Sequence, residues 1–392
     1  MRITDIREVA VPLHADIENS VVNFASHTVS LVAVRTDVRR NGRPLTGIAF
    51  NSIGRHAQGG ILRDRMVPRL LAADPGTLLD PATGLLSPAR VLRCAMRDEK
   101  PGGHGDRAGA AGAVELAVWD LLAKYHDEPA HAVIARAFGR EPARTGTPVY
   151  AAGGYYHADD SLDRLRDELT GYADQGYRVL KIKIGGAPLR DDLARVEAAI
   201  DVTGGGDGVA VDANGRFDRD RALAYAAALA DLGLRWYEEA GDPLDYALNR
   251  ELAEAYPGAI ATGENLFSAQ DARNLLDYGG MRPDRDILQL DPGLSYGLTE
   301  YARVLEAMEA RGVDRSQAFP HGGHLINLHI VTGLGLGGCE AYPGVFQPFG
   351  GYSPDCRLAG GLIRPGDAPG FGLEAKPGLQ DEIAALLKEL DS

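Results

Sequence analysis

Three carboxylates at regular spacing could do metal chemistry in this chain. Asp212, Glu238 and Glu264 are separated by 26 residues at each step, and each follows a short run of β-forming residues. If these runs are neighbouring parallel strands, their ends bring the three acids to one rim. Like charges held together need a cation, and oxygen ligands without thiols favour a hard ion, Mg²⁺ first and Mn²⁺ second. A single such acid could equally be a turn or helix-cap residue, but three in register favour the metal.

A pair of lysines, Lys181 and Lys183, lies one strand earlier. Residues two apart on a strand point to the same side, so both ammonium groups would face the barrel interior while Ile182 faces outward. Each ammonium lowers the pKa of the other, which would make one of them a usable base near neutral pH. The alternative is an exposed edge strand with solvated lysines, and a closed repeat of strands has no such edge.

A histidine and an aspartate complete the set of ionisable groups at strand ends. His321 ends the seventh run and Asp291 the sixth, so Asp291 could bond one imidazole nitrogen and leave the other to carry a proton. Alone, His321 would more often be structural. A cation on the three acids would stabilise the dianion formed when the α-proton of a bound carboxylate leaves. Lys183 would take that proton, and His321 would return one (racemisation) or donate one to a departing hydroxyl (dehydration).

The elements that must position these residues form a repeat. Helix-like stretches such as 161–174 alternate with eight β-rich runs at residues 149–151, 179–184, 209–211, 234–237, 259–262, 287–290, 317–319 and 338–341. This alternation predicts an α/β fold with a parallel eight-stranded (TIM) barrel. An open doubly wound sheet would favour a glycine-rich phosphate loop after its first strand, and Gly153-Gly154 followed by two tyrosines does not fit that fingerprint.

The first 130 residues follow a different pattern. Strands are expected at 3–13, 29–36 and 45–50, with a hairpin turn at residues 40–42, loops at 16–27 and 51–60, and a helix at 113–124. Strands followed by helices predict a small α+β domain.

Composition limits the class of protein and its partners. The 392 residues are 45% hydrophobic and 24% charged, as in a globular protein of two or three units. The net charge of −14 argues against nucleic acid and anionic membranes as partners. No apolar run approaches the ~18 residues of a membrane span, and the first residues do not resemble a secretion signal. Three cysteines without metal-ligand spacing predict buried thiols in a reducing cytoplasm.

The ordered set of residues resembles the mandelate racemase group of the enolase superfamily. The Lys-x-Lys strand, the acid 29 residues after Lys183, the two further acids and the His–Asp dyad carry the resemblance, together with the helix at 112–124. The resemblance implies a (β/α)7β barrel, Mg²⁺, and an N-terminal α+β capping domain whose two loops close over the barrel mouth. We therefore expect a capping domain at 1–130, the barrel at 131–350, and a C-terminal segment at 351–392 that packs back on the cap.

The same resemblance implies roles for single residues. Asp212, Glu238 and Glu264 would be the metal ligands, Lys183 with Lys181 the basic pair, and His321 with Asp291 the second acid/base. Glu340 matches the family's acid at the eighth strand and is expected at the substrate. The chain departs from the family at Glu238-Glu239-Ala240, where many members have proline after the paired acids, but the metal ligand itself is unchanged.

Within this group the chain looks most like the D-tartrate dehydratases, through residues 50–55, 99–105, 151–156 and 320–324. That implies dehydration of D-tartrate to an enol that tautomerises to oxaloacetate. A dicarboxylate needs a second cationic anchor, which Lys100, Arg55 or Lys181 could supply with Asn51, although Lys100 and Arg55 could also be solvated surface residues. We expect a cytoplasmic homo-oligomer that binds a small hydroxycarboxylate.

Other functions stay open at this stage. The nearest are a dehydratase of a longer aldonic or aldaric acid and a racemase or epimerase that uses Lys183 and His321. A non-catalytic sugar-acid binding protein is the alternative from another class, although such proteins are usually exported. A metal-dependent amidohydrolase would need His-x-His on the first strand, and residues 150–155 contain no histidine.

Overall fold

The N-terminal part of the molecule is an antiparallel sheet packed against helices. The structure is a computed structural model that describes residues 1–143, 145–157 and 161–391. Strands β1 (Ile3–Pro12), β2 (Thr28–Arg40) and β3 (Arg43–Phe50) pair in that order. The predicted hairpin turn is confirmed, with positive φ at Asn41 and Gly42. The long helix α5 (Asp106–His126) packs on β3 so closely that a Cβ at Gly47 would lie 1.9 Å from the Ala117 oxygen.

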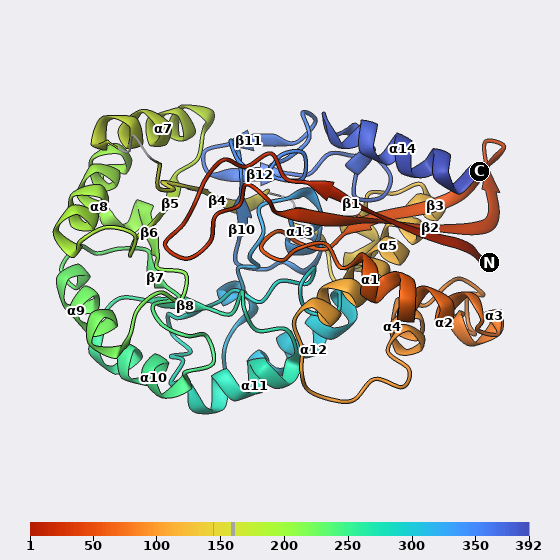
Figure 1. The fold of residues 1–392 in the computed structure, drawn as a ribbon, viewed down its shortest axis with the longest axis horizontal. Coiled ribbons are helices and arrows are strands. Elements are labelled where there is room, and N and C mark those ends of the chain that lie inside the picture. The colour runs from red at the N-terminus through yellow and green to blue at the C-terminus, as the bar shows by residue number, and fades with distance from the viewer. Residues whose placement is uncertain (144, 158–160, 392) are drawn as a thin grey trace.

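Shorter helices complete this region beside the sheet (Figure 1). They are α1 (Gly59–Ile61), a π-helical turn (Leu62–Met66), α2 (Val67–Leu71), α3 (Pro75–Leu78), α4 (Pro88–Ala95) and α6 (Ala130–Ala137). Residues 13–27 and 51–58 contain no strand or helix, so the predicted loops at 16–27 and 51–60 are confirmed except at residues 59 and 60, where α1 begins.

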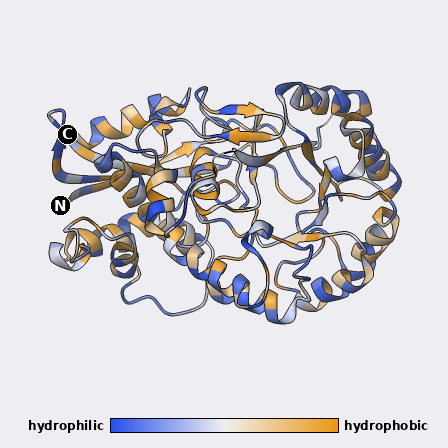
Figure 2. Ribbon diagram, turned by 180° about the vertical axis from the view of Figure 1, so that it is seen from behind, coloured by the Kyte–Doolittle hydropathy of each residue, from blue (hydrophilic) through white to orange (hydrophobic). Residues whose placement is uncertain are grey.

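The second region is a ring of parallel strands surrounded by helices, which confirms the predicted barrel class (Figure 1). Its strands are β4 (Thr147–Gly153), β5 (Val179–Lys183), β6 (Val209–Asp212), β7 (Trp236–Glu238), β8 (Ile260–Thr262), β9 (Ile287–Leu288) and β10 (Cys339–Ala341). Strand β10 pairs with β4 and so returns to the start of the ring. The surrounding helices are α7 (Leu162–Gln175), α8 (Leu189–Thr203), α9 (Arg219–Leu229), α10 (Tyr246–Ala255), α11 (Ala269–Tyr278), α12 (Leu298–Glu309) and α13 (Leu325–Leu334). In Figure 2 hydrophobic and hydrophilic residues are mixed along the surrounding helices.

The prediction of a seventh strand at 317–319 is wrong. A short 3₁₀ helix (Arg315–Gln317) occupies this position because Asp314 and Gln317 form a capping box around it. Ala318 forms a single parallel bridge to Leu288, and its carbonyl accepts from the Gly337 N–H. The Phe319 N–H donates to the Leu288 carbonyl at 2.9 Å, and the His321 N–H donates to the Gln289 carbonyl at 3.2 Å. The ring therefore closes between β9 and β10 through an irregular segment rather than a full strand.

The C-terminal residues return to both regions. Strands β11 (Arg357–Ala359) and β12 (Leu362–Arg364) form a hairpin that adds to β4. Helix α14 (Leu379–Asp391) lies along β1 and β2 (Figure 1), and the Arg35 guanidinium donates to the Leu390 carbonyl at 2.6 Å. All three cysteines are free, and Cys339 alone is fully buried. Among the described residues, no helix combines the length and apolarity needed to cross a membrane.

A buried carboxylate joins the N-terminal region to the barrel. Glu115 of α5 accepts hydrogen bonds from the Trp119 indole and from the Leu298 and Thr299 backbone at the start of α12, at 2.9–3.0 Å. The Thr299 hydroxyl adds a fourth bond at 2.6 Å. Burial raises the pKa of Glu115, although these donors oppose the shift.

We expect Glu115→Ala to destabilise the protein by about 3 kcal/mol, because several buried donors lose their acceptor at once. Chemical denaturation would measure the loss, with the exposed Glu254→Ala as the control. Equal unfolding midpoints for the two variants would show that the link contributes nothing to stability.

Candidate active site

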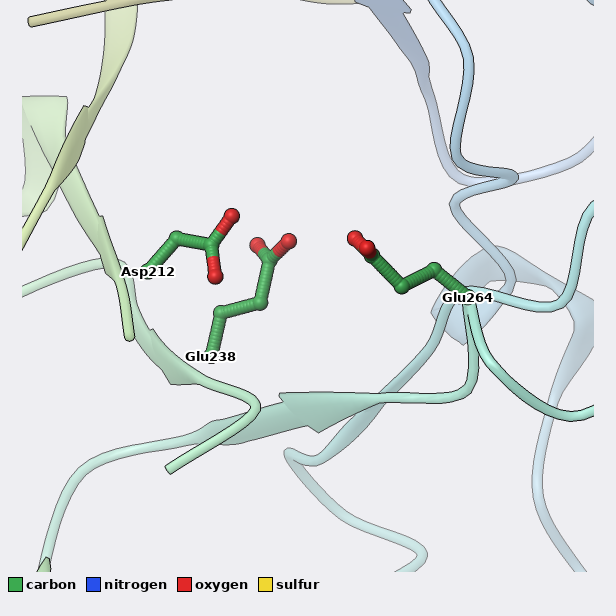
Figure 3. Close-up of side chains that lie close together, drawn as sticks. All are labelled: Asp212, Glu238 and Glu264. Atoms are coloured by element: carbon green, nitrogen blue, oxygen red, sulfur yellow. The ribbon is translucent and has the colours of Figure 1, made fainter. Parts of the chain in front are cut away.

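The three predicted metal ligands come together at the barrel mouth. Asp212 ends β6, Glu238 ends β7, and Glu264 follows β8. Their carboxylates point toward one another (Figure 3), and one oxygen from each lies within 4.8 Å of the others. Burial and the charge of Asp212 raise the pKa of Glu238 to about 8. The donor set is three carboxylates without nitrogen or sulfur, which fits a hard divalent cation such as Mg²⁺.

The lysine pair faces these acids, as the strand period predicts. Lys183 Nζ lies 2.5 Å from Asp212 Oδ2. Lys181 Nζ lies 2.7 Å from both Glu238 Oε1 and Glu340 Oε1. Burial opposes ionisation of Asp212, but the two ammonium groups outweigh it and lower the pKa of Asp212 to about 2.

The prediction that the lysine pair has a lowered pKa is wrong: the net shift in the pKa of Lys183 is upward. Burial and Lys181 do lower the pKa of Lys183, but Asp212, Tyr155 and Glu264 outweigh them and raise it above the ordinary value. The Lys-x-Lys motif contains only the two lysines, whereas the carboxylates around them come from other parts of the chain. A cation on these carboxylates would offset the charge that keeps Lys183 protonated.

His321 and Asp291 form the predicted dyad, and a tyrosine that was not predicted from the sequence contacts the histidine. His321 Nδ1 lies 3.3 Å from Asp291 Oδ2. The Tyr342 hydroxyl lies 3.1 Å from His321 Nε2 and donates to Glu340 Oε2 at 3.0 Å. Burial opposes the imidazolium, but Glu264 and the neighbouring acids outweigh it and raise the pKa of His321 to about 9. Tyr342 is two residues after Glu340, so the strand period could have placed both on one face.

Some of these groups line one small cavity beneath the N-terminal loops. It has a volume of 220 Å³, and its barrel side includes Lys183, Glu264 and His321. Asn19 and Arg55 from the two predicted loops line its other side. The loops are tied to the barrel, since the Ser20 hydroxyl donates to the Ala213 carbonyl at 2.9 Å and the Tyr156 N–H donates to the Glu18 carbonyl at 3.0 Å.

The structure brings only one of the expected cap anchors to this cavity. Arg55 donates through Nη2 to Asn265 Oδ1 at 2.6 Å and stacks over Phe267. Asn51 is buried at the end of β3 in the N-terminal sheet, where its Oδ1 accepts from the Ser30 N–H at 2.6 Å. Lys100 is exposed and lines a different cavity, beside His104 and Arg107. The anchoring roles of Asn51 and Lys100 stay predictions that this arrangement does not support.

Further polar residues line the cavity without having been expected. Asn265 donates to both oxygens of the buried Glu239 at 2.9–3.0 Å, and burial with the nearby Glu264 raises the pKa of Glu239 well above its usual range. Asn214 and Tyr155 also line the cavity. Asn214 and Asn265 follow the metal-ligand candidates within two residues, and that proximity is the signal that could have found them.

The fold and the site define a barrel that could hold a divalent cation and move protons at a carbon next to a carboxylate. Residues 164–379 match the family model described as Enolase C-terminal domain-like. The chain belongs to this family, and within the enolase superfamily to its mandelate racemase group.

Curated relatives match a little over half of the chain. Arabinonate dehydratase from Saccharolobus solfataricus is 28% identical over 230 residues, which is 58% of this chain and 58% of that protein. L-talarate/galactarate dehydratase from Salmonella typhimurium is 26% identical over 236 residues, covering 60% of this chain and 56% of that protein. The chain therefore matches less than two thirds of the length of either relative.

Solved structures match almost the whole chain. A racemase from Streptomyces coelicolor with bound magnesium has a TM-score of 0.77 at 23% identity, covering 98% of this chain and 99% of that one. L-Talarate dehydratase from Polaromonas, complexed with Mg and L-glucarate, has a TM-score of 0.75 at 21% identity, covering 97% and 96%. These likenesses establish the fold. The relatives bear the names of other acid-sugar enzymes, so the resemblance to D-tartrate dehydratases is not confirmed.

Proposed function

We propose that this protein is a Mg²⁺-dependent acid-sugar dehydratase whose substrate is a compact dicarboxylate, D-tartrate first. One observation carries the proposal: Lys183, His321 and Glu264 line a single cavity of 220 Å³, and Glu264 lies within 4.8 Å of the other two acids of the triad. The names of the dehydratase relatives support the reaction class.

The residues divide the reaction between them. Lys183 would take the α-proton, and His321, held by Asp291, would donate a proton to the β-hydroxyl as it leaves as water. The enol that remains tautomerises to the α-keto acid, which for D-tartrate is oxaloacetate. When bound to Asp212, Glu238 and Glu264, Mg²⁺ supplies positive charge where the substrate carboxylate becomes more negative. Tyr342 and Glu340 would keep the His321 ring oriented.

The size and charge of the cavity favour a short diacid. Its volume is below the ~300–1,000 Å³ of ordinary small-molecule pockets. Arg55 is the one arginine among the described residues that line the cavity. It would pair with the substrate carboxylate that lies farther from the acid triad. A longer aldonic or aldaric acid, which the relatives' names suggest, remains the second candidate.

A screen of acid sugars with Mg²⁺ and detection of α-keto acid product tests the proposal. D-, L- and meso-tartrate would be compared with five- and six-carbon aldonic and aldaric acids. We expect D-tartrate to give the highest kcat/KM. Turnover of only the longer acids would assign the second candidate, and racemisation without keto acid would assign a racemase. Binding without any turnover would indicate a sugar-acid binding protein.

We expect Arg55→Met to raise KM for the best dicarboxylate by about ten- to a hundredfold, since a hydrogen bond to a charged group contributes ~1.5–3 kcal/mol. A four-carbon monocarboxylate such as threonate should be affected less. Steady-state kinetics of both substrates measures the difference, with Lys100→Met as the matched variant. A rise in KM in Lys100→Met alone would move the anchor from Arg55 to Lys100.

A further inference from the structure

A second cavity contains a buried lysine that the proposed mechanism does not use. The cavity has a volume of 420 Å³ and lies where the C-terminal residues meet the barrel. Lys376 lines it, just after the 3₁₀ turn Leu373–Ala375 and before α14. The residue is only 3% exposed.

Lys376 differs from the other lysines of the chain in its partner. Of the six lysines, Lys124, Lys181 and Lys183 each lie within 2.7 Å of a carboxylate oxygen, and the remaining two, Lys100 and Lys388, are exposed. Lys376 Nζ instead donates to a neutral group, Gln347 Oε1, at 3.0 Å. Within the described parts of the chain it makes no ion pair. Burial lowers the pKa of Lys376 to about 8.

A buried ammonium without a counter-ion is unfavourable, because it loses hydration and gains no charge partner. It also has three donors, and Gln347 uses one of them. Among the described lining residues, Lys376 carries the single charge, and the rest of the wall combines apolar residues with neutral polar ones such as Gln347 and Ser353. One cation beside a neutral wall with apolar parts is the usual composition of a site for a small organic ligand.

We propose that this cavity binds a small monocarboxylate with an apolar body. Its carboxylate pairs with Lys376, and its body lies against Pro343, Leu358 and Ile363. A dicarboxylate fits less well, because its second charge would lie against neutral groups, with no second cation among the described lining residues. This ligand is therefore a different molecule from the proposed substrate.

The two cavities share a wall but no residue. Residues 342–351 separate them. Tyr342 and Phe346 line the cavity of the candidate active site (the active cavity), whereas Pro343 and Gln347 line the second cavity. The Gln347 carbonyl also accepts from the His14 N–H at 2.8 Å, at the start of a loop that covers the active cavity. A variant at Lys376 thus changes the second site while leaving every residue of the first in place.

Titration calorimetry of the full chain in Mg²⁺ tests the proposal, with benzoate as the probe and benzamide as its neutral analogue. We expect benzoate to bind wild type and the exposed-site control Lys388→Met alike. Lys376→Met should weaken benzoate binding by about tenfold or more, and benzamide should bind wild type correspondingly weakly. Equal benzoate affinity in Lys376→Met, or equal affinity of wild type for benzamide, would overturn the proposal.

A second measurement needs no variant. Trace acetylation of the wild-type protein, read by mass spectrometry, should be slowed by benzoate at Lys376 and unchanged at Lys388. Absence of that protection would refute the site even if Lys376→Met failed to fold. We expect the variant to fold and to unfold at no lower temperature, because methionine removes a buried unpaired charge.

Discussion

Lys183→Ala should abolish both keto-acid formation and the exchange of the substrate α-proton with D₂O. Lys183 lines the active cavity, and its Nζ lies 2.5 Å from Asp212, one of the three acids that would hold the cation. Without it the proposed base is missing, so the α-proton can be neither removed nor exchanged. Proton transfer by a positioned side chain is worth about 10²–10⁴ in rate, and we expect a loss at the upper end of this range.

His321→Asn should fail at a later step. The base and the acid triad remain, so the α-proton can leave and return, but no imidazole is present to protonate the departing hydroxyl. This variant should therefore still exchange the α-proton while making almost no keto acid. Proton NMR in D₂O follows the exchange, and a keto-acid assay follows the product.

Two exposed residues provide controls, Lys388→Ala and His126→Asn, which should match wild type in both assays. Loss of exchange in His321→Asn with retention in Lys183→Ala would reverse the two roles. Loss in both would indicate a concerted elimination or a damaged site, and circular dichroism of the variants would distinguish these outcomes.

The acidic rim could be predicted because strand ends follow a regular spacing. Asp212, Glu238 and Glu264 each come at or just after the end of a strand, so their positions depend on the repeat alone. Lys181 and Lys183 follow from the period of two along a strand. The seventh strand could not be predicted in the same way, since the local capping of Asp314 and Gln317 favours a 3₁₀ turn over an extended run.

The covering side of the cavity was predicted less well, because loop positions depend on contacts distant in sequence. Arg55 reaches the cavity through Asn265, 210 residues later. Lys100 has the same charge and was an equal candidate, yet its segment lies beside Tyr296 and Arg303 at a different cavity. The pKa of Lys183 was misjudged for a related reason: it depends on carboxylates from several strands, and a short motif does not contain them.

Glu264→Gln should weaken Mg²⁺ binding and reduce turnover by at least about a hundredfold, because it removes one of three charged ligands. The fold should survive. One oxygen from each of the three carboxylates lies within 4.8 Å of the others, so in the absence of a cation, neutralising one of them would relieve repulsion. We therefore expect the variant in EDTA to unfold at a temperature no lower than that of wild type.

Thermal unfolding with and without Mg²⁺ separates the metal site from catalysis. A ligand at about one hundred times its Kd stabilises a folded protein by ~2.7 kcal/mol. Mg²⁺ should thus raise the unfolding temperature of wild type and of the exposed control Glu254→Gln, and leave Glu264→Gln nearly unchanged. Equal Mg²⁺ shifts in all three proteins would remove Glu264 from the site. Full activity of wild type after chelation would refute metal dependence, even if the lysine and histidine predictions held.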